Sequence, residues 1–121
     1  MKLEIKNLCF AYGVHQVVQD VSFEAREGQF LAVLGVNGVG KSTMLKCINR
    51  INRPGAGSIL VDGRDITHMD GATLAKHIGY VSQSCEFAES TVFDAVLLGR
   101  KPFIKWDVTS RDLEIVQEVL D

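Results

Sequence analysis

Residues 35–43 read GVNGVGKST and directly follow the apolar run FLAVL at residues 30–34. This stretch gathers three glycines, one lysine and two hydroxyl residues within nine positions. Because glycine takes positive φ angles without steric cost, such a loop can curl tightly and turn several backbone N–H groups toward one anion. A short apolar run between glycines is typical of a strand buried on both faces of a parallel sheet, and residues 44–50 read as a helix. A strand, a glycine-rich loop and a helix are therefore predicted in this order.

The spacing Gly35-x4-Gly40-Lys41-Ser42 matches the P-loop pattern, which binds the phosphates of a nucleotide. In that pattern Lys41 supplies a point charge for the β and γ phosphates, and the Ser42 hydroxyl can ligate the magnesium that bridges them. The start of the helix adds unpaired amides and its dipole, and Thr43 can add another phosphate contact. A glycine-rich turn could precede a lysine by chance, but the strand and the helix that the motif requires are both predicted here.

Alternation of apolar and polar residues predicts a strand from Leu3 to Tyr12 and, after a turn at Gly13, further strand within residues 17–25. Two short apolar segments, at residues 58–61 and 78–81, are also expected to be strands. Asp62 follows the first of them and is interpreted as a turn residue.

Side chains suited to helix caps delimit the remaining helices. Asp70 can begin a helix that runs to about residue 77, and Thr91 can begin one that stops at Gly99. Thr109 and Asp112 have the spacing of an approximate capping box for a final helix. Residues expected to face inward are Leu45 and Ile48 in the P-loop helix, and Leu113, Val116 and Leu120 in the final helix.

The composition is that of an ordinary globular protein. The chain has 121 residues, 46% of them hydrophobic, and a net charge of -2, so as a whole it has no electrostatic footprint for nucleic acid or an anionic membrane. The cysteines form no CxxC pair and the histidines lack metal-ligand spacing, which disfavours a disulfide framework or a zinc site. No apolar run approaches the length that spans a bilayer, and the N-terminus does not resemble a signal peptide. Any membrane role is therefore expected to come through a partner.

Several segments together resemble the ATP-binding cassette (ABC) proteins. They are Tyr12, the spelling GVNGVGKST, the segment PGAGSILVDGRDI at residues 54–66 and the segment IGYVSQ at residues 78–83. The resemblance covers essentially the whole chain, in order. It implies an α/β protein with part of the P-loop NTPase fold: N-terminal antiparallel strands plus a mostly parallel sheet with helices, followed by the start of a helical subdomain. Residues 1–83 would form the N-terminal part of the ATP-binding core, and residues 84–121 the start of the helical subdomain.

The resemblance also implies roles for individual residues, with ATP and Mg²⁺ as cofactors. Tyr12 matches the aromatic residue that stacks on adenine; from spacing alone, a strand-end tyrosine could instead pack on a sheet edge. Gln83 matches the glutamine that contacts magnesium and the attacking water, so the resemblance implies catalytic roles for Lys41 and Gln83 and metal ligands at Ser42 and Gln83. The implied nucleotide-binding residues are Tyr12, Gly35, Asn37, Gly38, Gly40, Lys41, Ser42 and Thr43.

A narrower resemblance concerns residues 91–102, TVFDAVLLGRKP, which are similar to ATPase subunits of importers for iron-siderophore complexes and vitamin B12. It implies a transmembrane permease as partner, contacted through residues 84–90, and a second copy of the ATPase domain. It also implies a cytoplasmic location on the inner face of the membrane, and no direct binding of nucleic acid. Arg100 and Lys101 could instead be a solvated helix end.

Some elements of the ABC pattern are absent from these 121 residues. No Leu-Ser-Gly-Gly-Gln signature occurs, no histidine follows His77, and no apolar strand ends in the Asp-Glu pair that would supply a magnesium ligand and a general base. The chain therefore resembles the N-terminal half of an ABC domain, and we expect it to bind ATP without turning it over.

Other classes remain open because a P-loop by itself does not choose among kinases, GTPases, motors and transport ATPases. A soluble ABC-type ATPase acting on nucleic acid or ribosomes and a non-catalytic nucleotide-binding module are both alternatives. A metabolite kinase would not explain Tyr12 or the two segments at 54–66 and 78–83.

Overall fold

Two antiparallel strands begin the fold, as the sequence predicted. In the computed structural model, which describes residues 1–84, 86 and 89–121, strand β1 (Leu3–Tyr12) pairs with β2 (His15–Ala25). Gly13 lies in the turn between them with φ 57°. Apolar residues alternate along β1, and three of them, Ile5, Leu8 and Phe10, are buried, so the hairpin has one inner face.

The hairpin is extended into a four-stranded sheet by β3 (Ala56–Val61) and the short β4 (Arg64–Asp65), in the order β2-β1-β3-β4. Every pair of neighbouring strands in this sheet is antiparallel, which agrees with the predicted N-terminal antiparallel strands. Asp62 and Gly63 form the turn between β3 and β4, and both have positive φ angles. The interpretation of Asp62 as a turn residue is thereby confirmed.

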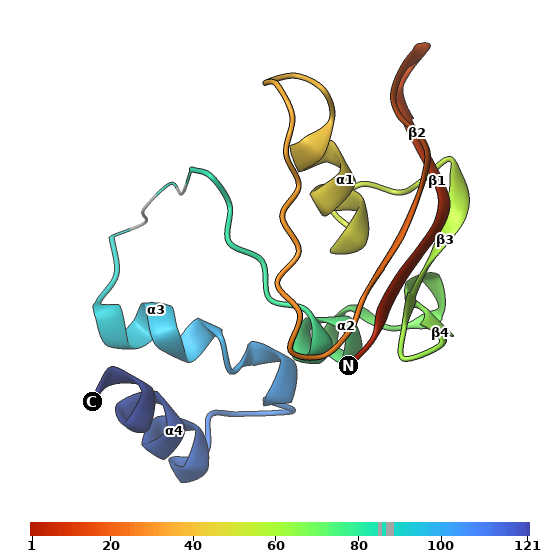
Figure 1. Ribbon diagram of the computed structural model, residues 1–121. Helices are drawn as coiled ribbons and strands as arrows, with labels where there is room; N and C mark the ends of the chain where they lie inside the picture. Colours follow the sequence, from red (N-terminus) through yellow and green to blue (C-terminus); the bar gives the residue numbers. More distant parts are fainter. Residues whose placement is uncertain (85, 87–88) are drawn as a thin grey trace. The chain divides into compact units, whose positions relative to one another are not determined.

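The predicted parallel strands are not formed in the part of the chain that the structure describes. Residues 30–34 and 78–81 lie outside any strand, and the first of these segments is the long extended connection that leads from β2 to α1 in Figure 1. Phe30 is 95% exposed and Leu34 is 89% exposed, so the predicted burial on both faces is wrong here. The reason is that a strand needs hydrogen-bonded neighbours, and the described strands pair only among themselves.

Helix α1 (Lys41–Ile48) follows the glycine-rich loop and packs on one side of the sheet (Figure 1). Its buried residues are Met44, Cys47 and Ile48, whereas Leu45 is 42% exposed. The inward position of Ile48 is therefore confirmed and that of Leu45 is wrong. Residues three and four apart share one helix face, so the face of Met44 includes Cys47 and Ile48 and turns Leu45 aside.

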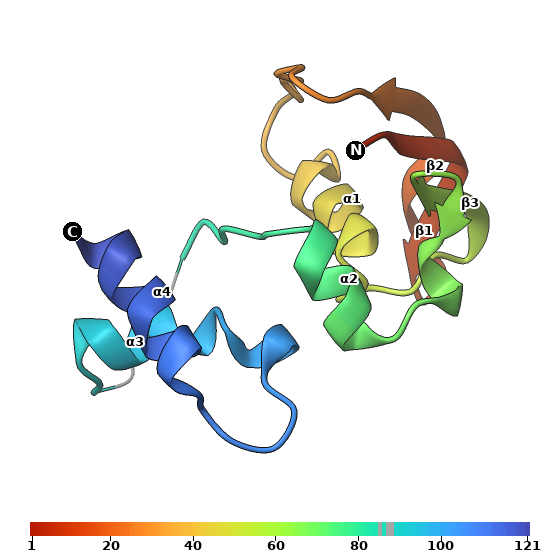
Figure 2. The same cartoon turned by 90° about the horizontal axis from the view of Figure 1, so that it is seen from below.

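The chain divides into two compact units, Met1–Asp70 and Gly71–Asp121. The first unit contains the sheet, α1 and the short 3-10 helix η1 (Ile66–His68). The second unit is helical and contains α2 (Gly71–His77), α3 (Val92–Leu98), the 3-10 helix η2 (Lys101–Phe103) and α4 (Ser110–Leu120). Helices α3 and α4 lie side by side (Figure 2). None of the helices in the described ranges is both long and apolar enough to cross a membrane.

The predicted caps of α3 and α4 are present. Thr91 accepts a hydrogen bond from the Asp94 amide at the start of α3, and Gly99 ends that helix. Thr109 and Asp112 form the capping box of α4. The predicted inner face of α4 is only partly correct, because Val116 is 1% exposed while Leu113 and Leu120 are 43% and 40% exposed.

Candidate functional site

The glycine-rich loop ends where α1 begins, and two of its glycines have conformations that other residues rarely adopt. Gly38 has φ 83° and Gly40, the N-cap of α1, has φ 107°. A Cβ atom on Gly40 would lie 2.8 Å from the Val17 carbonyl oxygen, so the contact with β2 also requires a glycine. Because Gly40 has no side chain, no side chain caps the first turn of α1, and its amides are available to a ligand.

Lys41 closes this loop. Its Nζ atom donates a hydrogen bond to the carbonyl oxygen of Gly35, which links the two ends of the loop. The ammonium group thus lies at the loop opening, while Ser42 and Thr43 follow it in the first helical turn. The structure brings together the loop, the cation and the two hydroxyl residues that the sequence predicted as one site.

A hollow of about 400 Å³ lies beside the loop. Its walls come from β2, from Val33 and Leu34 in the extended connection, and from the end of the loop at Val39, Gly40 and Lys41. The lining is largely apolar, with Lys41 as its cationic group. A hollow of this kind can accommodate a ligand whose anionic group contacts Lys41 and whose less polar part contacts the apolar lining.

Tyr12 lies at the end of β1 and is 52% exposed. Its ring meets Phe10 edge-on, with centroids 4.8 Å apart and planes at 85°, and its hydroxyl accepts a hydrogen bond of 3.1 Å from Asn52 Nδ2. Tyr12 therefore packs on Phe10 at the end of β1, an inner strand of the sheet, and half of its surface remains accessible. Its role in stacking on adenine remains a prediction. Both described contacts go to residues outside the glycine-rich loop.

Residues 18–121 match the ABC transporter family. The chain belongs to this family.

Relatives of known sequence or structure agree with that membership. The chain is 52% identical over 120 residues to an uncharacterized ABC transporter ATP-binding protein of Methanocaldococcus jannaschii, covering 99% of this chain and 47% of that protein. It is 38% identical over 105 residues to a phosphate import ATP-binding protein of Tropheryma whipplei, covering 82% of this chain and 41% of the relative. A solved bacterial Atm1-family ABC exporter with ATP bound superposes with a TM-score of 0.76 at 31% identity, covering 91% of this chain and 18% of that chain. The chain thus spans less than half the length of these relatives, and it has the α/β fold of an ABC ATPase domain.

Two features with a predicted function, Gln83 and the loop at residues 84–90, belong to the second unit. Gln83 is exposed on a bend, whereas the glycine-rich loop belongs to the first unit. The loop at 84–90, predicted to contact a permease, includes residues 85, 87 and 88, which lie outside the described residues. The roles of Gln83 and of this loop remain predictions.

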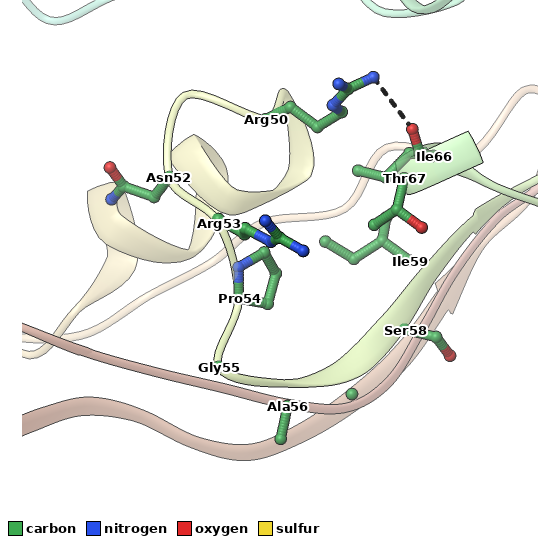
Figure 3. A pocket seen from close by; sticks show the side chains of 11 residues that line it. Arg50, Asn52, Arg53, Pro54, Gly55, Ala56, Ser58, Ile59, Ile66 and Thr67 are labelled. Atoms are coloured by element: carbon green, nitrogen blue, oxygen red, sulfur yellow. Dashed lines mark hydrogen bonds between the residues drawn. The ribbon is translucent and has the colours of Figure 1, made fainter. Parts of the chain in front are cut away.

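A second hollow in this ABC domain, of about 480 Å³, lies where α1 leads into β3 (Figure 3). Arg50 and Arg53 both line it. The Arg50 guanidinium donates hydrogen bonds to the carbonyl oxygens of Ile66, at 3.2 Å, and Met69, and Arg50 itself has φ 62°. No local sequence pattern marks Arg50, because its partners are 16 and 19 residues further along the chain. Its bonds brace η1 against the end of α1.

Cys47 on α1 and Asp65 before η1 have shifted pKa values. Burial raises the pKa of the Cys47 thiol on α1, which keeps it protonated and unreactive. The backbone amide of Thr67, and then its hydroxyl, lower the pKa of Asp65 at the start of η1. Within the described residues no cluster of three His, Cys, Asp or Glu side chains is placed to hold a metal ion.

Proposed function

We propose that this chain is the nucleotide-binding part of an ABC importer ATPase that couples MgATP binding and hydrolysis to transport of iron-siderophore or cobalamin-like substrates. The observation that carries the nucleotide part of the proposal is the loop from Gly35 to Lys41. Its two left-handed glycines precede an uncapped helix start, and its lysine lies at the opening. Membership of the ABC transporter family supports the same ligand.

The residues present fit a triphosphate. The Lys41 ammonium bonds a neutral carbonyl oxygen, that of Gly35, and a phosphate oxygen is a stronger acceptor for a cation than a neutral carbonyl. Amides of the loop and of the first turn of α1, with Thr43, would hold the phosphates, while Ser42 and Gln83 would hold Mg²⁺. Bound Mg²⁺ supplies positive charge that offsets the phosphates. The accessible face of Tyr12 would stack on adenine.

The import direction and the substrate class depend on one stretch of sequence, residues 91–102, which form α3 and the start of η2. The names of the relatives include both import and export proteins. These names support the ABC transporter family, but they do not distinguish import from export. In this proposal residues 1–83 are the N-terminal part of the ATP-binding core, and residues 84–121 begin the helical subdomain. The compact units divide slightly earlier, after Asp70, and α2 packs on η2 within the second unit.

The partners in this proposal are a transmembrane permease, contacted through residues 84–90, and a second copy of the ATPase domain. The protein would act in the cytoplasm, at the inner face of the membrane. Hydrolysis needs a general base for the attacking water, and the sequence of this chain offers no candidate at the expected kind of position. The 121-residue chain would therefore bind ATP without sustained turnover.

Calorimetry with MgATP on the 121-residue chain tests the nucleotide site. We expect Lys41→Ala to weaken binding about tenfold or more, because a charged hydrogen bond to phosphate is lost. Lys46→Ala, on the same helix but away from the loop, is the matched control and should bind as the unmodified chain does. Equal affinity of the two variants, with both folded by circular dichroism, would refute the site. A phosphate-release assay then tests the lack of turnover: sustained release that Lys41→Ala abolishes would contradict it.

Affinity purification of the tagged full-length protein from detergent-solubilised membranes tests the transport role. Co-purification of a permease, with ATPase activity stimulated by an iron-siderophore or cobalamin-loaded binding protein, is the expected result. Recovery with ribosomes or nucleic acid would favour the soluble ABC-type alternative instead. Nucleotide binding by a full-length protein that lacks hydrolysis would favour the non-catalytic module.

A further inference from the structure

Residues 100–106 of the second unit read RKPFIKW and combine three cations with two aromatic rings. Trp106, the only tryptophan of the chain, is 98% exposed, and Phe103 is 47% exposed. Lys101 and Lys105 are exposed as well. A tryptophan usually buries most of its large apolar surface. A ring left wholly in solvent, directly after Lys105, therefore points to a surface that binds a partner.

The base of this loop is fixed by charged contacts. Arg100 forms an ion pair of 2.9 Å with Asp112, and its guanidinium lies 4.3 Å from the centroid of the Phe103 ring. The Lys76 ammonium of α2 lies 5.0 Å from the same centroid. The capping box of Thr109 and Asp112 holds the other end of the loop at α4. Residues 104–108 therefore connect two segments that are each held in place by these contacts.

The loop is locally basic although the chain as a whole is acidic. From residue 100 to residue 112 there are four cations and two acids, whereas the net charge of the full chain is -2. Arg100 is paired with Asp112, and Arg111 with Glu114 and Glu118, which leaves Lys101 and Lys105 against the single acid Asp107. Lys101 and Lys105 have no ion pair among the described residues, so their charges are available to an outside partner.

We propose that the loop at residues 100–106 docks on the surface of an anionic lipid bilayer. Lysines near such a surface are attracted by its negative potential, and tryptophan and other aromatic rings favour the interface between headgroups and acyl chains. A specific protein partner normally covers a much larger area than one loop offers, on the order of 800 Å². This inference is independent of nucleotide binding, and it concerns a different segment from the proposed permease contact at residues 84–90.

Because Trp106 is the only tryptophan, its fluorescence reports on this loop alone. The experiment mixes the 121-residue chain with vesicles of phosphatidylglycerol and phosphatidylcholine, or of phosphatidylcholine alone, and measures flotation, emission wavelength and quenching by acrylamide. We expect flotation, a blue shift and protection of Trp106 with the anionic vesicles only, and loss of all three at high salt.

Charge and ring are then tested separately. Lys101→Glu combined with Lys105→Glu should lower partitioning onto the anionic vesicles at least about tenfold, because two attractive charges become repulsive. The matched control is Lys6→Glu combined with Arg64→Glu, which makes the same change in net charge on exposed residues of the first unit and should partition normally. Trp106→Ser should reduce flotation strongly, and Trp106→Phe only weakly.

Several outcomes would overturn the proposal. Flotation that leaves Trp106 open to acrylamide would mean that another segment, such as the exposed run at 30–34, contacts the lipid. If the control double variant lost as much partitioning onto the anionic vesicles, the binding would depend on the net charge of the chain and not on this loop. A response of Trp106 to a soluble acidic polypeptide but not to vesicles would assign the loop to a protein partner instead.

Discussion

Gly40 and Val17 approach each other so closely that a Cβ atom on Gly40 would lie 2.8 Å from the Val17 carbonyl oxygen and 2.9 Å from its Cγ1 atom. Gly40 also has φ 107°. A side chain there would therefore meet two obstacles, the strain of the left-handed region and a collision with the backbone of β2. The loop that precedes α1 is held against the sheet through this contact.

We predict that Gly40→Ala lowers the free energy of unfolding by about 3 kcal/mol, since it combines backbone strain with a collision that β2 or α1 must relieve. Urea denaturation followed by circular dichroism measures the change. Gly38→Ala is the matched control: Gly38 has φ 83° but open space around its Cα, so only strain of about 1 kcal/mol is expected. Similar losses in the two variants would show that the contact with Val17 is unimportant.

A second glycine lies between two strands. Gly57 in β3 has φ 88°, and a Cβ atom there would lie 2.4 Å from the Asn7 carbonyl oxygen and 2.6 Å from that of Lys6. Because the obstacle is the backbone of β1, no side-chain rearrangement can relieve it. We predict that Gly57→Ala costs at least about 2 kcal/mol in the free energy of unfolding and slows the formation of soluble protein.

The comparison variant is Gly63→Ala. Gly63 has φ 78° in the turn between β3 and β4, with open space around it, and should lose only about 1 kcal/mol. Thermal unfolding of both variants, each at the same concentration, distinguishes the two cases. A Gly57→Ala protein as stable as the Gly63→Ala protein would show that β1 and β3 separate at little cost.

Features that depend on neighbours in sequence were predictable. The caps at Thr91 and at Thr109 with Asp112 use hydrogen bonds that span three residues, and the left-handed turn at Gly38 and Gly40 follows from residue type. The order of strand pair, glycine-rich loop and helix could be read for the same reason. The glycine-rich loop with P-loop spacing was therefore recognisable before any contact between distant segments was known.

Features that depend on distant segments were not predictable from pattern alone. The apolar run at 30–34 was predicted to be buried because of its composition, yet burial requires neighbouring strands, and the described strands do not pair with it. The face of α1 that packs on the sheet does not include Leu45, which is exposed and not buried as predicted. Arg50 was missed because its carbonyl partners, Ile66 and Met69, belong to a different element.

Arg50 offers a test of such a distant contact. One nitrogen of its guanidinium donates to two carbonyl oxygens at once, those of Ile66 and Met69. A lysine side chain ends in a compact ammonium on a flexible stem and does not place a donor where the rigid planar group does. We predict that Arg50→Lys lowers the free energy of unfolding by about 1–2 kcal/mol, as measured by urea denaturation. Arg53→Lys, in the same hollow but with no hydrogen-bond partner among the described residues, should leave stability unchanged. If both substitutions were neutral, the brace between α1 and η1 would have no energetic role.

Asp112 predicts an acid-dependent loss of stability in the second unit. The Thr109 backbone amide, then the Thr109 hydroxyl and Arg100, hold the pKa of the Asp112 carboxyl below its ordinary value. Since the folded state thus favours the charged carboxylate, its contribution to stability is fully present above the unfolded pKa, near about 4. That contribution is lost as the pH falls from there through the lower folded pKa.

We therefore expect Asp112→Asn to be less stable than the unmodified protein at neutral pH, and the difference to shrink as the pH falls below about 4. Unfolding followed by circular dichroism at a series of pH values measures it. The control Asp94→Asn makes the same change in charge on α3, where Asp94 has no ion pair among the described residues. The difference in stability between this variant and the unmodified protein should not shrink in the same way as the pH falls. Parallel stability curves for the Asp112→Asn and unmodified proteins would mean that the ion pair with Arg100 and the capping box stabilise the fold no better than a neutral amide does.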